Sequence, residues 1–156
     1  HESKEEYIVC YFLNTPTEET QQKLLKFIKE SRKIVIALNS RLEHVENEVT
    51  VLYPDCGPRE FIGYISNAEY VLTDSYHGML FSIIYHRQFW SIAREYGKFD
   101  QSSRQLSVLE MFGLNARYCR TQDIITEDTI DYETVQKRLD SEIEKSLNYL
   151  RRALEK

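Results

Sequence analysis

The chain has 156 residues, of which 42% are hydrophobic and 12% aromatic, and 25 acidic against 20 basic residues give a formal net charge of −5. This length predicts one domain with a single core, and the composition argues against disorder or a repeat architecture. Acidic and basic residues are mixed along the sequence without a basic face, so no nucleic-acid partner is expected.

The sequence also lacks the usual signs of membrane insertion and metal binding. No apolar segment approaches the ~20 residues of a membrane span, and the amino terminus has no apolar core of a signal peptide. We therefore expect a cytoplasmic protein without a membrane span, with peripheral association at the inner membrane face as a further option. The three cysteines, Cys10, Cys56 and Cys119, are widely spaced, which predicts reduced thiols and no metal site.

The first forty residues read strand, helix, strand. Apolar runs at Tyr7–Leu13 and Lys33–Leu38 predict two buried strands. Between them, Thr15 as N-cap, Pro16 at the first helical position and Glu18 at the third predict a capping box that opens a helix. Two strands joined through a helix imply a right-handed parallel crossover and hence an α/β sheet.

The middle of the chain continues this alternation. A polar loop over residues 39–47 precedes a third short strand at Val49–Tyr53. Pro58 should open the next helix and Asn67 should close it. The short apolar run Tyr70–Thr73 then predicts another buried strand, followed directly by a helix.

The last third adds one strand and two helices. Gln88–Ala93 predicts a strand, and after a loop from residue 94 to 101, Ser102 with Gln105 should form a capping box for a helix that stops at Gly113. Residues 131–156 predict one long amphipathic helix, lying across the sheet or toward another domain. The expected fold is α/β, a Rossmann-like parallel sheet of about five strands with helices on both faces.

A polar cluster follows the strand that ends at Thr73. Asp74 or Ser75 should cap the next helix, which places His77 and Gly78 in its first turn at the carboxyl edge of the sheet. Ligands of open α/β sheets bind at that edge. Free N–H groups, a glycine that permits close approach and a titratable imidazole together suit an anion.

Two more cationic side chains are predicted at helix starts on the same edge. Arg59 follows Pro58, and Arg104 lies in the helix that begins near residue 102. Because a cation is disfavoured at a helix amino terminus, these arginines together with His77 suggest a pocket for a multiply charged anion. Helix capping alone would explain Asp74 and Ser75, although Asp74 could also orient His77 or act as a base. No GxSxG, GxGxxG, Walker A or HExxH motif is present, which argues against dinucleotide, P-loop and zinc-protease chemistry.

Two stretches carry a resemblance to a known family. Gly57-Pro58-Arg59-Glu60-Phe61-Ile62 and the segment Asn67 to Gly78 resemble the carboxyl-terminal half of polysaccharide pyruvyl transferases. The family pattern has Pro-x-Glu-Phe, a strand ending in Thr-Asp-Ser-Phe-His-Gly, a strand with an aromatic residue and an arginine-bearing helix ending in Gly-Leu. These features fall on Pro58, Glu60 and Phe61, on Thr73 to Gly78, on Phe89, on Arg104 and on Gly113-Leu114. The sequence departs from the pattern with Tyr76 for Phe, Arg87-Gln88 for Lys-Pro and Ser103 for Asn, and Arg59 is not part of the pattern.

The resemblance implies that residues 1–156 are a single Rossmann-like domain, the second half of a two-domain GT-B-like enzyme. Such an enzyme moves a pyruvyl group from phosphoenolpyruvate, its donor substrate, to sugar hydroxyls as a ketal in surface polysaccharide biosynthesis, without a cofactor. His77 would be the catalytic acid or a phosphate ligand. The predicted substrate-binding residues are Asn14, Arg59, Glu60, Asp74, Ser75, Gly78 and Arg104. The missing amino-terminal domain and a saccharide acceptor would be the partners, and the fragment alone should be inactive.

Two other functions fit the same residues. One is a GT-B glycosyltransferase domain that binds a nucleotide-diphosphate sugar, with Glu60 accepting a ribose hydroxyl. The other is a non-catalytic Rossmann-like binding module in which His77 is only a residue of a capped turn.

Overall fold

Six parallel strands form the centre of the molecule, for which a computed structural model describes residues 5–94 and 102–155. The strands are β1 (Tyr7–Tyr11), β2 (Ile34–Leu38), β3 (Val51–Leu52), β4 (Tyr70–Thr73), β5 (Gln88–Ile92) and β6 (Tyr118–Cys119). Their order in the sheet is β3-β2-β1-β4-β5-β6, and every neighbouring pair is parallel. This is the order of a Rossmann fold. The predicted α/β class is confirmed, with one strand more than expected because β6 is too short to show a period.

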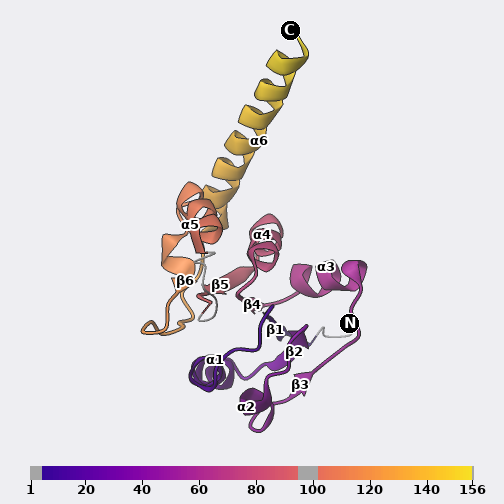
Figure 1. Cartoon of the computed structure of the whole chain (residues 1–156), viewed down its shortest axis with the longest axis vertical. Coiled ribbons are helices and arrows are strands. Elements are labelled where there is room, and N and C mark those ends of the chain that lie inside the picture. The colour runs from indigo at the N-terminus through magenta and orange to yellow at the C-terminus, as the bar shows by residue number, and fades with distance from the viewer. Residues whose placement is uncertain (1–4, 95–101, 156) are drawn as a thin grey trace.

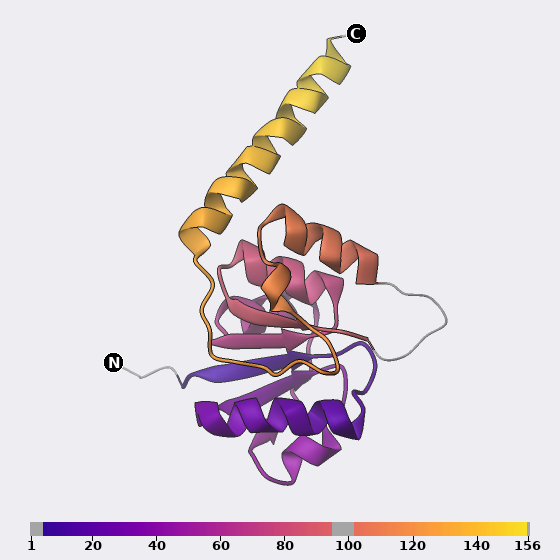
Figure 2. The ribbon, with the colours of Figure 1, turned by 90° about the vertical axis from the view of Figure 1, so that its left-hand side faces the viewer.

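Helices cover both faces of the sheet (Figures 1 and 2). They are α1 (Glu18–Ser31), α2 (Glu43–Glu46), α3 (Pro58–Ser66), α4 (Tyr76–Ile84), α5 (Ser102–Met111) and α6 (Tyr132–Leu154), with a 3₁₀ turn at Asn115–Arg117. Apolar side chains of α1 and α2 form one hydrophobic cluster with the sheet, and those of α3, α4 and α5 form a second. The strands between them are buried on both sides, which explains their continuous apolar runs.

Helix α1 begins later than predicted. Its N-cap is Thr17, whose side chain accepts the backbone N–H of Thr20 across 3.2 Å, so the prediction of Thr15 as cap is wrong. The reason lies in Gln21, a buried residue whose Nε2 donates to the carbonyl oxygen of Pro16 across 2.9 Å. That contact holds Pro16 outside the helix, in the loop that leaves β1.

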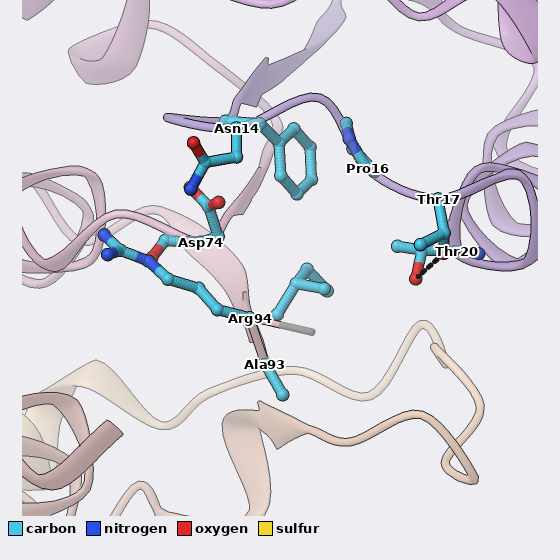
Figure 3. A pocket seen from close by; sticks show the side chains of 9 residues that line it. Asn14, Pro16, Thr17, Thr20, Asp74, Ala93 and Arg94 are labelled. Carbon is cyan, nitrogen blue, oxygen red and sulfur yellow. Dashed lines mark hydrogen bonds between the residues drawn. The ribbon is translucent and has the colours of Figure 1, made fainter. Parts of the chain in front are cut away.

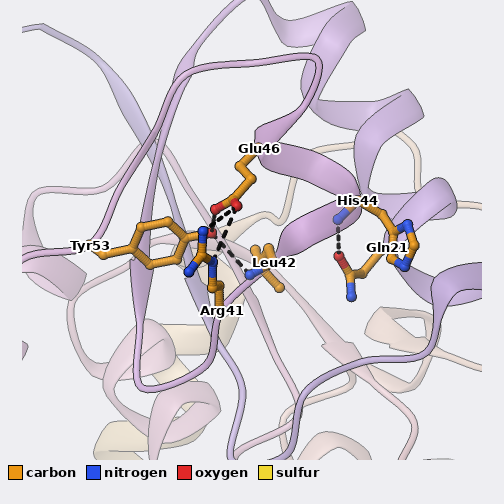
Figure 4. Close-up of polar contacts among 6 residues, drawn as sticks. All are labelled: Gln21, Arg41, Leu42, His44, Glu46 and Tyr53. Atoms are coloured by element: carbon orange, nitrogen blue, oxygen red, sulfur yellow. Dashed lines mark hydrogen bonds and ion pairs between the residues drawn. The ribbon is translucent and has the colours of Figure 1, made fainter.

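Helix α2 lies where the sequence predicts only a polar loop. Two remote side chains satisfy the N–H groups at its start: Gln21 accepts the His44 N–H across 2.9 Å, and the hydroxyl of Tyr53, directly after β3, accepts the Leu42 N–H across 3.0 Å. The same hydroxyl donates to Glu46 Oε2 across 2.6 Å, and Arg41 completes the group with two hydrogen bonds to Glu46 (Figure 4). Burial, the largest cause, and the Glu46 contact raise the pKa of Tyr53 to about 12, so the phenol remains a donor at neutral pH. These contacts are remote in sequence, which is why periodicity could not reveal α2.

Helix α5 starts at Ser102 and ends as predicted, but the capping box expected at its start is not formed by Gln105. Gly113 has a φ of +69° and the Leu114 N–H bonds back to the Leu109 carbonyl oxygen, a glycine-ended helix terminus. A capping box would direct Gln105 Oε1 to the Ser102 N–H, but this oxygen accepts no hydrogen bond within residues 5–94 and 102–155. Instead, Gln105 Nε2 donates to the carbonyl oxygen of Asp74, directly after β4, across 3.4 Å. Residues 95–101 of the predicted loop lie outside the described residues.

Helix α6 stands away from the rest of the molecule (Figures 1 and 2). Asp131 caps it by accepting the Glu133 N–H across 3.1 Å. Its first turns are anchored: Tyr132 donates to the Ser82 carbonyl oxygen across 3.3 Å and Val135 is 3% exposed. The helix does not lie across the sheet. That residues 1–156 are one domain of a longer protein stays a prediction.

Candidate functional site

The turn between β4 and α4 is fixed by its own side chains. Ser75 is the N-cap of α4 and accepts the Gly78 N–H across 3.3 Å, so the cap is Ser75 and not Asp74. The Ser75 N–H in turn donates to Thr73 Oγ1 across 3.0 Å. His77 lies in the first turn of α4, at the carboxyl edge of the sheet, and its side chain is exposed.

Asp74 joins the two central strands of the sheet. Its Oδ1 accepts the Leu13 N–H across 2.8 Å, so it fastens the loop that leaves β1 to the end of β4. Its carbonyl oxygen accepts Arg94 Nε across 3.2 Å and Gln105 Nε2 across 3.4 Å. Burial raises the pKa of the Asp74 carboxyl, and the backbone donors and Arg94 oppose that rise. The carboxylate therefore has a structural function whether or not it also contacts substrate.

Gly78 is required by packing. A Cβ at this position would lie 2.6 Å from Thr73 Oγ1 and 3.2 Å from Thr73 Cβ. Thr73 is buried and its hydroxyl donates to the Tyr11 carbonyl oxygen across 2.6 Å, so it cannot move aside. The glycine thus lets α4 start directly against β4. The sequence predicted a glycine here for the close approach of a ligand, whereas the structure explains it by packing against Thr73.

Tyr76 brings two of the predicted cationic residues together. The guanidinium carbon of Arg104 lies 4.1 Å from the Tyr76 ring centroid, a cation–π distance. The His77 ring meets the same tyrosine edge to face, with 5.7 Å between the centroids. The N–H groups of Tyr76 and His77 precede the first hydrogen bond of the helix, which Met79 donates to the Ser75 carbonyl oxygen. A guanidinium and an imidazole therefore both contact a ring at the amino terminus of α4, and such a terminus can bind an anion.

The first turn of α3 is not joined to this group by any contact. Arg59 is exposed and forms no hydrogen bond or ion pair within the described part of the chain. Glu60 is also exposed, and its Oε2 lies 2.8 Å from where a Cβ of Gly57 would be, so the carboxylate folds back over the start of its own helix. The ring of Phe61 lies 4.7 Å from the ring of Tyr11, and Tyr64 further along α3 accepts a hydrogen bond from Tyr7 across 2.8 Å. Of the three side chains expected to meet, Arg104 and His77 contact the same ring, and Arg59 has no described contact with them.

A shallow hollow of about 20 Å³ opens between the loops that follow β1, β4 and β5. The side chains of Asn14, Asp74 and Arg94 lie together on one side, and Thr17 and Thr20 lie on the other (Figure 3). In this strand order the chain reverses its direction of travel between β1 and β4, and ligands of such sheets bind at that point.

Sequence reasoning found Asn14 and Asp74 but missed Arg94, Thr17 and Thr20. The available signal for Arg94 was its position, two residues beyond the end of β5, because β5 pairs with β4 and its end must lie near Asp74. Within residues 5–94 and 102–155, no group of three or more His, Cys, Asp or Glu side chains could hold a metal ion. Among the described helices, none is long and apolar enough to cross a lipid bilayer.

Two solved structures of one sugar-nucleotide enzyme have a similar fold. UDP-GlcNAc 2-epimerase from Methanocaldococcus jannaschii superposes with a TM-score of 0.51 at 13% identity, over 86% of this chain and 38% of that one. The same enzyme in complex with UDP-GlcNAc and UDP gives a TM-score of 0.50 at 15% identity, over 87% and 38%. At this identity the similarity shows the fold alone, and it confirms a Rossmann-like fold of the GT-B type. The chain spans 38% of the length of these structures.

Sequence comparison identifies the family. No curated protein matches the chain. The sequence profile of polysaccharide pyruvyl transferases matches residues 2–96, more than half of the chain, and this stretch includes β1 to β5 and the turn that carries His77. With the motif at Thr73–Gly78 on the carboxyl edge of a Rossmann-like sheet, the chain belongs to the polysaccharide pyruvyl transferase family.

Proposed function

We propose that this chain is the donor-binding half of an enzyme that transfers a pyruvyl group from phosphoenolpyruvate to a sugar, forming a ketal in surface polysaccharide biosynthesis. The observation that carries the proposal is that Arg104 and His77 both contact the ring of Tyr76, at the start of α4. Phosphoenolpyruvate carries a phosphate and a carboxylate, and this group offers a guanidinium, an imidazole and helix N–H donors to them.

The reaction needs an acid near the donor. The methylene carbon of the enol phosphate takes a proton, and the oxygen of a sugar hydroxyl bonds to the adjacent carbon and loses its own proton. The carbon–oxygen bond to phosphate then breaks, the oxygen of a second sugar hydroxyl bonds to the same carbon, and the proton of that hydroxyl passes to the departing phosphate, which closes the ketal. His77 is exposed in the first turn of α4, where it would protonate the methylene carbon or bind the phosphate. Arg104 would hold the negative charge that develops on the leaving phosphate.

The remaining predicted residues would shape the donor pocket. Asn14 and Asp74 border the hollow beside β4, and Ser75 with Gly78 fixes the turn that presents His77. An amino-terminal domain would supply the saccharide acceptor site and the opposite wall, so the 156-residue chain alone should not catalyse transfer. The proposal needs no cofactor and assigns the enzyme to the cytoplasm, where phosphoenolpyruvate is made.

A nucleotide-diphosphate sugar is the second candidate donor. It is favoured by the fold shared with an epimerase solved in complex with UDP-GlcNAc and UDP. A diphosphate would use the same helix start, but the ribose would require Glu60, whose carboxylate folds back over its own helix. Phosphoenolpyruvate is therefore preferred. In a purely binding module, neither donor would be consumed.

Thermal denaturation of the full-length protein distinguishes these functions, because only a ligand of the native state raises Tm. Phosphoenolpyruvate should raise Tm in a concentration-dependent way, and inorganic phosphate or UDP-GlcNAc should raise it much less. Incubation with phosphoenolpyruvate and saccharide acceptors, followed by mass spectrometry, should then show a pyruvyl ketal. Stabilisation by UDP-GlcNAc but not by phosphoenolpyruvate would reject the proposal in favour of the second candidate, and no response to either would favour a binding module.

A further inference from the structure

The outer part of α6 carries an apolar stripe that nothing in the described chain covers. The helix has 23 residues and is about 34 Å long. Val135 and Leu139 near its start pack against the body. Beyond them, four large apolar side chains are between 49% and 85% exposed: Ile143, Leu147, Leu150 and Leu154.

The spacing of these four residues is that of a coiled-coil seam. Successive members are four, three and four positions apart, which places them alternately at the d and a positions of a heptad. In proteins, most of the stability of a helix comes from packing its apolar face rather than from intrinsic propensity. We therefore expect another helix to pack against the stripe.

We propose that the partner is a second copy of this chain, with the outer halves of two α6 helices packed antiparallel. In the register that pairs all four residues, Ile143 faces Leu154 of the second copy and Leu147 faces its Leu150. The two-fold axis repeats both layers, so every apolar residue of the stripe is covered by another. The proposal is independent of the catalytic function.

The charges beside the stripe support this orientation. Glu144 and Arg151 both occupy e positions on one flank, and in the same register Glu144 of each copy faces Arg151 of the other. Neither side chain forms an ion pair within the described chain. The opposite flank holds Ser146 and Ala153, which are small and let the helices approach closely.

A parallel pair would lose this complementarity. The g-to-e contacts of a parallel seam would place Ser146 against Arg151 and Leu139 against Glu144, with no opposite charges. The antiparallel arrangement also sends the two globular bodies to opposite ends of the paired helices. Since the outer half of α6 stands clear of its own body, the second helix has room to lie against it (Figures 1 and 2).

Sedimentation equilibrium of the 156-residue chain tests the association directly. We expect a reversible dimer whose population rises with concentration from about 1 to 500 µM, together with a gain of helical circular dichroism as α6 is covered. Leu147→Glu with Leu150→Glu should weaken association at least 10-fold and leave Tm of the monomer unchanged, since the body is anchored by Val135. Tyr149→Ser is the matched control, because Tyr149 is 74% exposed and lies off the stripe.

Charge exchange tests the orientation. Glu144→Arg or Arg151→Glu alone should weaken the dimer about 3- to 10-fold at low salt by placing like charges opposite each other. The double exchange should restore it, and mixing the two single variants should give a heterodimer in preference to either homodimer. A monomer at every concentration, or a double variant no better than the singles, would overturn the proposal. So would a full-length protein that stays monomeric and loses Tm with Leu147→Glu, because another domain would then cover the stripe.

Discussion

The carboxylate of Asp74 holds the backbone N–H of Leu13 at 2.8 Å, so the residue after β4 fixes the loop after β1. The loops at the two central strands are thereby one rigid unit, and the start of α4 is built on it. Burial disfavours the charged form of the Asp74 carboxyl, and it therefore raises the pKa of this group. The first prediction follows from this raised pKa.

Asp74→Asn should keep the fold and flatten its pH dependence. The raised pKa means that the native state holds the proton more tightly than the unfolded chain, in which an Asp carboxyl titrates at about 3.9. The free energy of unfolding should therefore fall as pH rises from that value through the native pKa. The substituted amide can still accept the Leu13 N–H without a charge, so the variant should equal or exceed the parent in stability at neutral pH.

Asp74→Ala is the matched comparison for this substitution. It should cost about 1–3 kcal/mol by leaving the Leu13 N–H unpaired. Urea unfolding of both variants and the parent, from mildly acidic to neutral pH, measures the difference. An asparagine variant as unstable as the alanine variant would contradict the assignment.

Gly78→Ala should destabilise the fold by about 1–3 kcal/mol, because its methyl would overlap the fixed side chain of Thr73. Gly63→Ala is the matched control: a Cβ there meets nothing within 4 Å and Gly63 lies inside α3, so alanine should stabilise by about 0.5–1 kcal/mol. Equilibrium unfolding of both variants gives the comparison. Equal effects of the two substitutions would show that the side chain of Thr73 can move to accommodate the methyl group.

His77→Gln should abolish most transfer without changing stability. The side chain is exposed, so no cavity opens, whereas a lost acid–base group typically costs ~10²–10⁴ in rate. His86→Asn, where asparagine tolerates the φ of +57°, is a control for turnover only: His86 bonds Gln136 across 2.6 Å and stacks on Tyr132, so this variant should keep turnover and lower Tm. The full-length enzyme should be assayed at saturating donor, together with Tm. Near-normal turnover in His77→Gln would remove the catalytic role.

Arg104→Ala should raise KM for the donor about 10-fold or more if the guanidinium binds an anionic group of phosphoenolpyruvate. Tyr76→Phe keeps the ring under Arg104 and should change neither KM nor kcat, whereas Tyr76→Leu should behave like a milder Arg104→Ala. Arg59→Ala should have a smaller effect, since Arg59 has no contact within the described chain that places it in this group. Steady-state kinetics of the four variants decide among these outcomes, and a larger effect at Arg59 would restore the three-cation pocket.

The fold was largely predictable because its strands are buried on both faces. Continuous apolar runs at β1, β2 and β4, and a proline or polar cap before most helices, leave few alternatives to a parallel sheet. The misses have a common cause. Helix α2 depends on Tyr53, eleven residues from the N–H that it caps, and the start of α1 depends on Gln21 reaching back to Pro16. Such contacts are set by tertiary structure and leave no periodic signal.

The site was predicted only where its residues belong to one local segment of the chain. His77 and Ser75 belong to one local turn, and their positions follow from the strand, cap and helix around them. Arg104 meets His77 only through the ring of Tyr76, and Arg94 reaches Asp74 from a neighbouring strand. The order of strands decides both contacts, and that order cannot be read from the spacing of residues along the chain. Gly78 was found for the wrong reason, since only the packed structure shows Thr73 behind it.

The place of β1 at the centre of the sheet also constrains how the protein can be synthesised. Its register pairs residue 7 with residue 34 on one side, but residue 8 with residue 70 on the other. A growing chain can therefore complete β1, α1 and β2 while the second edge of β1 still has no partner. Throughout the synthesis of the next thirty or so residues, a fully apolar strand edge is open to mispairing with other nascent chains. Chaperone binding to this interval, and a slow step in refolding that ends when β4 docks, are the consequences to look for.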